Sequence, residues 1–331
     1  MSKPDDYLWD RSGPADPDVQ RLEELMSPLA HDRPLDELRM KRPKRRAPWI
    51  AGIAVAVAAA AVLVLWLRTR SSAPCSGDDG FAFTAKGGTV GCNDGTVASG
   101  RLPVGGTLDT GTASAQIVIA AIGTAELAPG TRIRLDVSVE NKRQQLHLEH
   151  GRMHARVTAP PRIFAITTPS TGVTDLGCEY TVEIDAKGKG WIEVQSGRVE
   201  LETSAPAVIV APACTTARMR EGKQPSVPTY TGATPALRAA VIDFEDGKAG
   251  ALARVLELAT KDDAITLATL AVLGADRELV LSRLAVLSPP PGGITIRDAV
   301  ANAAVLEKWR EDIILGMVVA SLEYDGKCPQ N

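Results

Sequence analysis

One short stretch gathers the side chains that could bind a metal ion. The four candidate ligands are His147, Glu149, His150 and His154. Histidine nitrogens together with a carboxylate are ligands that zinc accepts in proteins. Arg152 and Arg156 lie in the same stretch, however, and their positive charges would oppose a bound cation. We therefore favour a solvated face of mixed charge over a metal site, and we expect no metal and no cofactor.

Patterns that would indicate catalysis are missing from the sequence. It contains no Gly-x-Ser-x-Gly elbow, no phosphate-binding loop and no dinucleotide fingerprint. The paired carboxylates Asp262 and Asp263 stand where a helix would begin, so capping explains them. A hydrolase would need a nucleophile with an adjacent base, and no such pair is visible. We expect that the protein is not an enzyme.

A long apolar stretch predicts a membrane span, and therefore the side of the membrane on which each other part of the chain lies. Residues 49–67 carry no charged side chain, and a helix of about 19 residues spans roughly 28 Å, close to the hydrocarbon thickness of a bilayer. Trp49 and Trp66 stand at its ends, where indole rings favour the headgroup level. A buried core helix of this length would normally carry a polar stripe. We predict a transmembrane helix over residues 48–68.

The charges beside this stretch predict its orientation. The basic residues before it are Arg39, Lys41, Arg42, Lys44, Arg45 and Arg46, whereas only Arg68 and Arg70 follow closely. By the positive-inside rule, residues 1–47 stay in the cytoplasm and the remainder is exported. A cleaved signal peptide fits less well, because its leading segment is much shorter than 47 residues. We predict a single-pass inner-membrane protein with a periplasmic C-terminal part.

Charge and cysteine content agree with this topology. The chain has 331 residues and a formal net charge of −3, so no overall basic excess indicates nucleic acid, and anionic lipid explains the one basic cluster. All five cysteines follow the apolar stretch, as disulfides in an oxidising compartment require. We prefer the pairs Cys75–Cys92 and Cys178–Cys214, which leaves Cys328 over, although sequence alone does not fix the connectivity.

The cytoplasmic segment predicts one amphipathic helix. Asp16 is suited to an N-cap and Pro17 to the first helical position. The apolar residues that follow at helical spacing are Val19, Leu22, Leu25, Met26 and Leu29. A helix of about 12 residues is marginal in water by itself, so its stripe needs a partner or the membrane surface. The alternative is a frayed helix without a partner.

The exported part divides into three regions by pattern. Residues 69–100 are polar and glycine-rich and predict a linker with a hairpin, which Cys75 and Cys92 would fix. Residues 101–214 alternate apolar and polar side chains between turn residues, which predicts an all-β sandwich or β-solenoid. The expected strands are 115–122, 124–128, 131–137, 144–149, 152–158, 162–167, 178–184, 190–195 and 197–202.

Residues 232–325 change to helical spacing and predict an all-α region. The expected helices begin at Thr234-Pro235, cover 248–260, 262–273 and 276–287, and end with a long helix from Thr295 to about residue 322. The middle helices are short and similar in length, which is typical of stacked helical hairpins. The stretch 313–322 is apolar, but about ten residues cannot span a bilayer.

The β region resembles the FecR domain, the extracytoplasmic domain of transmembrane regulators. The matching features are the Gly-x-x-x-x-x-Pro-Gly-Thr turn from Gly123 to Thr131, the Leu-x-x-Gly of Leu148 to Gly151, Phe164-x-Ile-x-Thr-Pro, the stretch Gly177 to Val182, and the closing Val194, Gly197 and Val199. This resemblance covers about 100 residues. It implies an all-β periplasmic module that is regulatory rather than catalytic.

The resemblance also implies a partner for the cytoplasmic segment. Proteins of this family commonly hold an extracytoplasmic-function sigma factor through a short helical N-terminal region. The implied anchors are Tyr7, Leu8, Trp9, Leu22, Leu25, Met26 and Leu29, since aromatic and aliphatic side chains dominate interface energies. We expect a regulator that senses an extracytoplasmic signal, with an envelope protein as a possible second partner. The alternative is a membrane-anchored periplasmic scaffold or binding protein without a sigma-factor role.

Overall fold

The computed structural model describes residues 17–27, 75, 80–137, 144–158, 160–203, 208–323 and 328. The chain forms two units, Met1–Leu67 and Arg68–Asn331, and each is described by itself. In the first unit, helix α2 covers Pro17–Met26, with the proline at the first helical position as predicted. No helix within the described ranges is both long and apolar enough to cross a bilayer. The predicted transmembrane segment, residues 48–68, lies outside those ranges.

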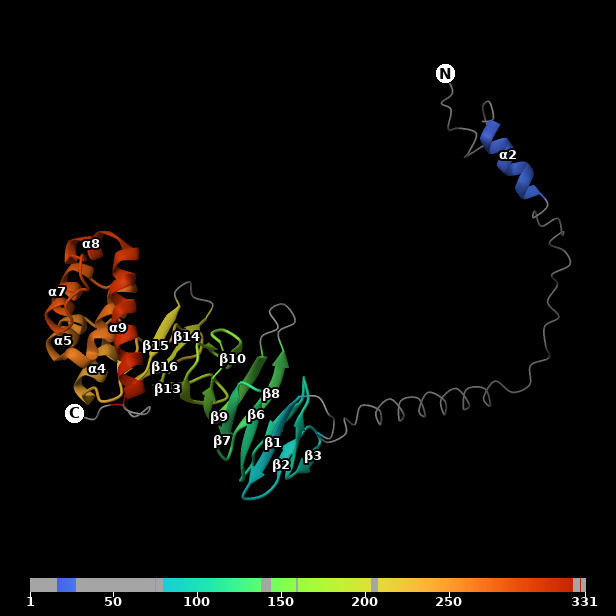
Figure 1. Ribbon diagram of the computed structural model, residues 1–331, viewed down its shortest axis with the longest axis horizontal. Coiled ribbons are helices and arrows are strands. Elements are labelled where there is room, and N and C mark those ends of the chain that lie inside the picture. The colour runs from blue at the N-terminus through green and yellow to red at the C-terminus, as the bar shows by residue number, and fades with distance from the viewer. Residues whose placement is uncertain are drawn as a thin grey trace. The chain divides into compact units, whose positions relative to one another are not determined.

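The second unit begins with a large β structure (Figure 1). In the described part of the chain, 17 strands belong to one hydrogen-bonded network. The first nine are β1 (Phe81–Lys86), β2 (Val90–Cys92), β3 (Gly95–Val97), β4 (Ser99–Leu102), β5 (Thr107–Asp109), β6 (Ser114–Ile119), β7 (Gly123–Leu127), β8 (Arg132–Val137) and β9 (Gln144–Val157). The others are β10 (Phe164–Thr167), β11 (Gly172–Asp175), β12 (Glu179–Ile184), β13 (Gly190–Ser196), β14 (Arg198–Glu202), β15 (Ile209–Pro212), β16 (Thr215–Met219) and β17 (Thr229–Tyr230).

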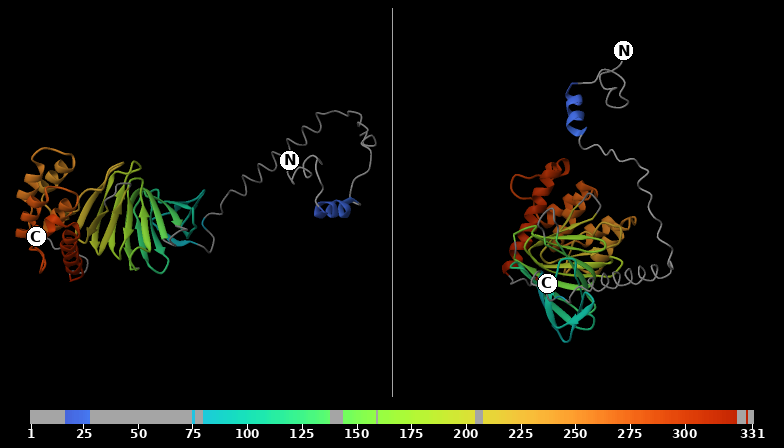
Figure 2. Two further views of the ribbon diagram at one scale, coloured as in Figure 1. Left: turned by 90° about the horizontal axis from the view of Figure 1, so that it is seen from above. Right: turned by 90° about the vertical axis from the view of Figure 1, so that its right-hand side faces the viewer.

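These strands make two layers that share β9. The first sheet has the order β4-β1-β6-β7-β9-β12-β13-β16-β17. The second sheet has the order β3-β2-β5-β8-β9-β10-β11-β14-β15, and its β9–β10 pair is parallel whereas the other pairs are antiparallel. Hairpins such as β10–β11, β12–β13 and β14–β15 fall alternately in the two sheets, so the chain advances along a sandwich, as the colour progression in Figure 2 shows.

Strand β9 corrects one prediction. The sequence predicted two strands, 144–149 and 152–158, separated by a turn at His150-Gly151, but β9 is one strand of 14 residues. Its first half pairs in the second sheet and its second half pairs in the first. The chain bends at Gly151, where φ is +104° and a Cβ atom would lie 2.4 Å from the Cα of Thr131. Glycine therefore permits a bend that passes the strand between layers without reversing it.

The sandwich core is built from the predicted alternation. Ile133 and Leu135, Leu146 and Leu148, and Met153, Ala155 and Val157 are all buried between the sheets, while the residues between them face outward. This period of two is what places alternate side chains on opposite faces of a strand. The predicted sheet-rich domain is therefore confirmed.

The sheet is larger than the sequence predicted. Residues 80–100, expected to be a linker with a hairpin, form β1 to β3 and part of β4, and Phe81, Phe83 and Val90 enter the core. Strands β5, β11, β15, β16 and β17 were also not predicted. These strands have only two to five residues, too few for a clear alternation, so pairing with neighbouring strands decides their conformation.

The predicted C-terminal helical region is confirmed. Its helices are α4 (Pro235–Glu245), α5 (Ala251–Leu258), the 3-10 turn η3 (Lys261–Asp263), α6 (Ala264–Val272), α7 (Arg277–Leu287), α8 (Ile296–Ala301) and α9 (Ala303–Glu323). Thr234 and Asp276 cap α4 and α7 as their positions suggested, and Thr295 forms a capping box with Asp298. The prediction of a single long helix from Thr295 to about residue 322 is wrong, because the chain is extended at Asn302 between α8 and α9.

Disulfides fix both ends of the second unit. Cys75 is joined to Cys92, the pair that the sequence analysis preferred. Cys214 is joined to Cys328, so the predicted Cys178–Cys214 pair is wrong. Cys178 is instead a buried free thiol, and its sulfur lies 2.8 Å from a carboxylate oxygen of Asp175.

Candidate functional site

The outer face of the first sheet carries a row of charged and aromatic side chains. Arg152 on β9 is the cross-strand neighbour of Glu183 on β12, and Glu183 is the neighbour of Trp191 on β13. The row exists because these residues alternate with buried ones, so their side chains point away from the core. The sheet therefore holds three chemically different groups next to one another on its solvent face.

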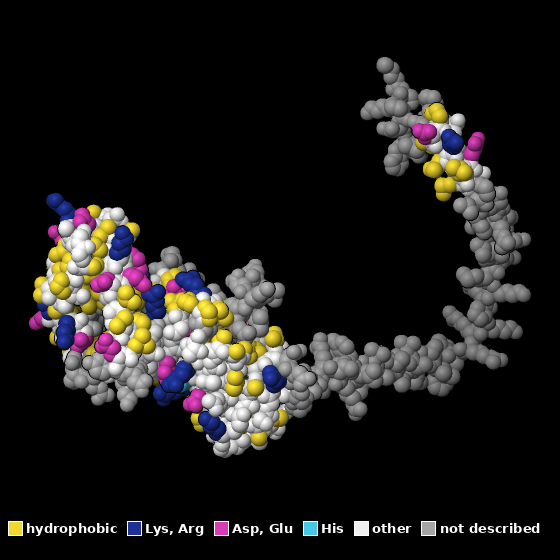
Figure 3. Space-filling model, viewed as in Figure 1, with side chains coloured by type: hydrophobic (Ala, Val, Ile, Leu, Met, Phe, Trp, Pro, Cys, Tyr) yellow, Lys and Arg dark blue, Asp and Glu magenta, His cyan; other side chains and the backbone are white. Residues whose placement is uncertain are grey.

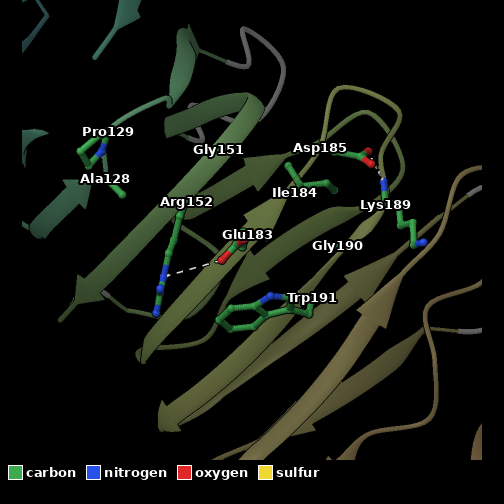
Figure 4. A pocket seen from close by; sticks show the side chains of 10 residues that line it. All are labelled: Ala128, Pro129, Gly151, Arg152, Glu183, Ile184, Asp185, Lys189, Gly190 and Trp191. Carbon is green, nitrogen blue, oxygen red and sulfur yellow. Dashed lines mark hydrogen bonds and ion pairs between the residues drawn. The ribbon is translucent and has the colours of Figure 1, made fainter. Parts of the chain in front are cut away.

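Arg152 links the row together (Figure 4). Its guanidinium lies over the ring of Trp191, 5.5 Å from the centroid, and its Nε is 3.9 Å from a carboxylate oxygen of Glu183. A guanidinium over an indole face is attracted by the negative face of the ring. The side chain of Arg152 is 55% exposed, so it contacts both neighbours and still faces solvent.

A cavity of about 420 Å³ opens beside this row. Ala128 and Pro129, which precede β8, form an apolar wall, and Ile184, Asp185 and Lys189 at the β12–β13 turn form the opposite side (Figure 4). The Oδ1 atom of Asp185 accepts the backbone N–H groups of Lys187 and Lys189, both at 2.9 Å. The turn therefore has a fixed shape, with the Lys189 side chain exposed at its end.

A second cavity, of about 240 Å³, adjoins the first and shares Ala128 and Arg152 with it. Its walls include Lys86, Glu126 and His154. We call the two cavities together the Arg152 groove. The Nζ of Lys86 lies 3.6 Å from the carboxylate of Glu126, so each half of the groove contains an ion pair of opposite charges.

The histidines that the sequence offered as candidate metal ligands are divided between the two sheets. His154 contacts the hydroxyl of Thr181 at 3.0 Å and the carboxylate of Glu179 at 3.1 Å, whereas His147 contacts Thr167. Within the described ranges, no group of three or more potential ligands could hold a metal ion. Burial would raise the pKa of Glu179, but the hydrogen bond and charge of Arg156, together with His154, lower it. The interpretation as a face of mixed charge agrees with these contacts.

The predicted cytoplasmic anchors are only partly described. On α2, the side chains of Leu22, Leu25 and Met26 are 58%, 71% and 56% exposed. They lie on one face of the helix because their spacing follows its turn. The other predicted anchors, Tyr7, Leu8, Trp9 and Leu29, lie outside the described residues. The described part of this segment therefore presents an apolar stripe to solvent.

A buried polar pair in the sandwich was not found by sequence reasoning. The thiol of Cys178 donates to Oδ2 of Asp175 at 2.8 Å, and the N–H of Gly177 donates to Oδ1 at 2.6 Å. Burial raises the pKa of Asp175 to about 6, and burial with the Asp175 charge raises the pKa of Cys178. A raised pKa makes Cys178 a poor nucleophile. The Asp-x-x-Cys spacing of Asp175 and Cys178 could have indicated this pair. We did not consider it because Cys178 was assigned to a disulfide with Cys214.

A comparison with protein families finds a match within the sandwich. The family model described as FecR protein matches residues 106–200, which covers β5 to β13 and most of β14, including the strands of the Arg152 groove that follow β1. The resemblance deduced from the turn and strand motifs is therefore confirmed. A comparison with curated proteins finds no match.

Solved structures with similarity to the chain include two crystal structures of a "putative anti-sigma factor" from Parabacteroides distasonis ATCC 8503. The first has 15% sequence identity and a TM-score of 0.33, and covers 38% of this chain and 59% of its own. The second has 17% identity and a TM-score of 0.28, and covers 33% of this chain and 51% of its own. The chain thus spans between half and three-fifths of the length of these two structures.

Proposed function

We propose that this chain, with its FecR match over residues 106–200, is a membrane-anchored regulator of transcription. Its cytoplasmic N-terminal region would hold an extracytoplasmic-function sigma factor, and its exported sheet domain would receive the signal. The FecR match supports a regulatory role for the sheet domain. The absence of a catalytic pattern in the sequence supports a non-enzymatic role.

The exposed stripe of α2 is the observation that carries the sigma-factor proposal. The helix has 10 residues, and none of them is buried. A helix this short is marginal in water, so burial of Leu22, Leu25 and Met26 by a partner would supply the free energy that keeps it folded. Helix-in-groove recognition uses this spacing of apolar anchors.

The membrane part of the proposal rests on the sequence of residues 48–68. Within it, residues 49–67 carry no charged side chain, and six basic residues precede it within residues 39–46. Such an arrangement would keep α2 with the transcription machinery and export the sandwich with its disulfides. A topology reporter fused after residue 40 or after residue 100 tests it, because the two fusions should report opposite compartments.

The sigma-factor proposal can be tested with the full chain. We expect that an extracytoplasmic-function sigma factor from the same cell copurifies with the tagged chain in detergent. Leu25→Asp should reduce recovery at least about tenfold, because it places a carboxylate in the centre of the stripe. Gln20→Asp adds the same charge on the opposite face of α2 and should leave recovery unchanged. Equal recovery with both variants, or no sigma factor with the unaltered chain, would contradict the proposal.

An anchored envelope-binding protein without a sigma-factor role is the second candidate, and the Arg152 groove is the observation that brings it into consideration. A groove on the exported domain could serve a scaffold as well as a sensor, and an envelope protein or glycan would then be the main partner. A sigma-factor gene beside the gene for this chain would favour the regulator. Unaltered transcription after deletion of residues 1–30 would favour the scaffold.

A further inference from the structure

We infer that the Arg152 groove is a binding site for a neutral oligosaccharide. The inference deepens the proposed function, on which it rests for the placement of the sheet domain outside the cytoplasm. It names the class of ligand that the sensing domain would bind. Four features of the groove carry it: its charge balance, its position on a sheet face, its mixed walls and its length.

The charges of the groove are balanced. Arg152 has Glu183 at 3.9 Å, Lys86 has Glu126 at 3.6 Å, and Lys189 shares its turn with Asp185. Phosphate groups, nucleic acids and other polyanions bind where cations exceed carboxylates. Each cation here has an acidic neighbour, so an uncharged ligand fits the local field best.

The position of the groove on the sheet argues against an extended peptide as its ligand. The groove lies over β1, β6, β7, β9, β12 and β13, which are interior strands of the first sheet and are paired on both sides. A peptide that adds as a strand needs the unpaired N–H and C=O groups of a sheet edge. Recognition in this groove must therefore come from side chains.

The walls offer both polar and apolar contacts. Arg152 supplies N–H donors and Glu183 supplies acceptor oxygens, while Trp191 and Pro129 supply carbon surface. A sugar ring has hydroxyl groups at its edges, which both donate and accept, and C–H faces that pack on aromatic rings. An apolar small molecule would instead need an enclosed, mainly apolar cavity.

The central donor contacts two neighbours before any ligand arrives. The guanidinium of Arg152 lies 5.5 Å from the centroid of the Trp191 ring, and its Nε is 3.9 Å from a carboxylate oxygen of Glu183. Contacts that restrict a long side chain in advance reduce the entropy lost on binding. Arg152 lines both cavities, of about 420 and 240 Å³, as Ala128 does. Arg152 therefore stands at the middle of an elongated site that suits a chain of sugars.

Titration calorimetry on the full chain tests the inference, in a detergent whose headgroup is not a sugar. The probes are chitotetraose and maltotetraose, which are neutral, and tetragalacturonate, which is acidic. We expect saturable binding of at least one neutral probe with a Kd below about 1 mM. Trp191→Ala and Arg152→Ala should weaken it at least about tenfold. Arg156→Ala removes another exposed, ion-paired arginine of β9 outside both cavities, and should change the Kd less than about twofold.

Specific outcomes would overturn the inference. These are no binding of either neutral probe, binding of tetragalacturonate alone, or equal losses in Arg152→Ala and Arg156→Ala. Because Trp191→Ala removes a large side chain, Arg152→Gln is measured with it, and the melting temperature of each variant is compared with that of the unaltered chain. No sigma factor is present in the experiment. A negative calorimetry result would therefore count only against the oligosaccharide site. The proposed binding of α2 to a sigma factor would still be tested separately by copurification.

Discussion

The backbone N–H of Thr231 donates a 2.9 Å hydrogen bond to the carbonyl of Cys214, whose sulfur is bonded to Cys328. Thr231 is where the chain leaves β17 and enters the helical region, and Cys328 follows the last helix, α9. The helical region is therefore attached to the sandwich at both of its ends through one residue. Arg198 on β14 adds a salt bridge to Glu311 on α9.

Loss of the Cys214–Cys328 disulfide should destabilise the protein. The bond closes a loop with a sequence separation of 114 residues, and bonds that close long loops typically contribute about 2–4 kcal/mol. We expect Cys328→Ser to lower the free energy of unfolding in urea by about that amount. As a control, alkylation of the unfolded, unreduced chain should label only Cys178. Labelling at Cys214 or Cys328 in the unaltered chain would refute the assigned connectivity.

Stability should fall as the pH rises from 4 to 7. The pKa of Asp175 is about 6 in the folded chain and about 3.9 in an unfolded one, so the folded state binds the proton more tightly. The stabilisation is complete below pH 4 and is lost as the pH passes 6, with a difference of about 3 kcal/mol. Urea unfolding at pH 4.5 and 7 should show this slope, and Asp175→Asn should flatten it. Asp94→Asn, at an exposed position, should retain the slope of the unaltered chain.

Two glycines with positive φ should respond differently to alanine. A Cβ at Gly151 would lie 2.4 Å from the Cα of Thr131, whereas a Cβ at Gly130 would meet no atom within 4 Å. Gly130→Ala should cost about 1–2 kcal/mol, the usual penalty of a left-handed residue. Gly151→Ala should cost clearly more, because the bend of β9 must also open. Similar melting temperatures for the two variants would show that β9 does not pass Thr131 so closely.

Removing the hydroxyl of Tyr180 should not destabilise the sandwich. The side chain is fully buried, and its hydroxyl oxygen has no hydrogen-bond partner among the described residues. An unsatisfied buried polar group costs about 1–3 kcal/mol, so we expect Tyr180→Phe to be neutral or stabilising in urea unfolding. Tyr180→Ala should instead lose about 3–5 kcal/mol through the cavity that it leaves. A marked loss in Tyr180→Phe would indicate a hydrogen bond to that oxygen.

Local patterns in the sequence determined the main elements. The alternation at Leu146, Leu148 and Met153 placed these residues in the core, and the caps at Thr234, Asp276 and Thr295 marked true helix starts. Such features depend on residues within one turn or one strand, so they can be predicted without a partner. The motifs between Gly123 and Val199 likewise predicted the FecR resemblance that the family comparison confirmed.

Relationships between distant residues were decided by the tertiary structure. Arg152 and Trp191 meet only because β9, β12 and β13 pair in one register, and the groove was not predicted for that reason. Cys214 bonds to Cys328 rather than Cys178 because the end of the chain returns to β17 after the helical region. The sequence fixes which face of a strand each residue occupies. Pairing between strands fixes which residues become neighbours, because that choice depends on the energy of the whole sandwich.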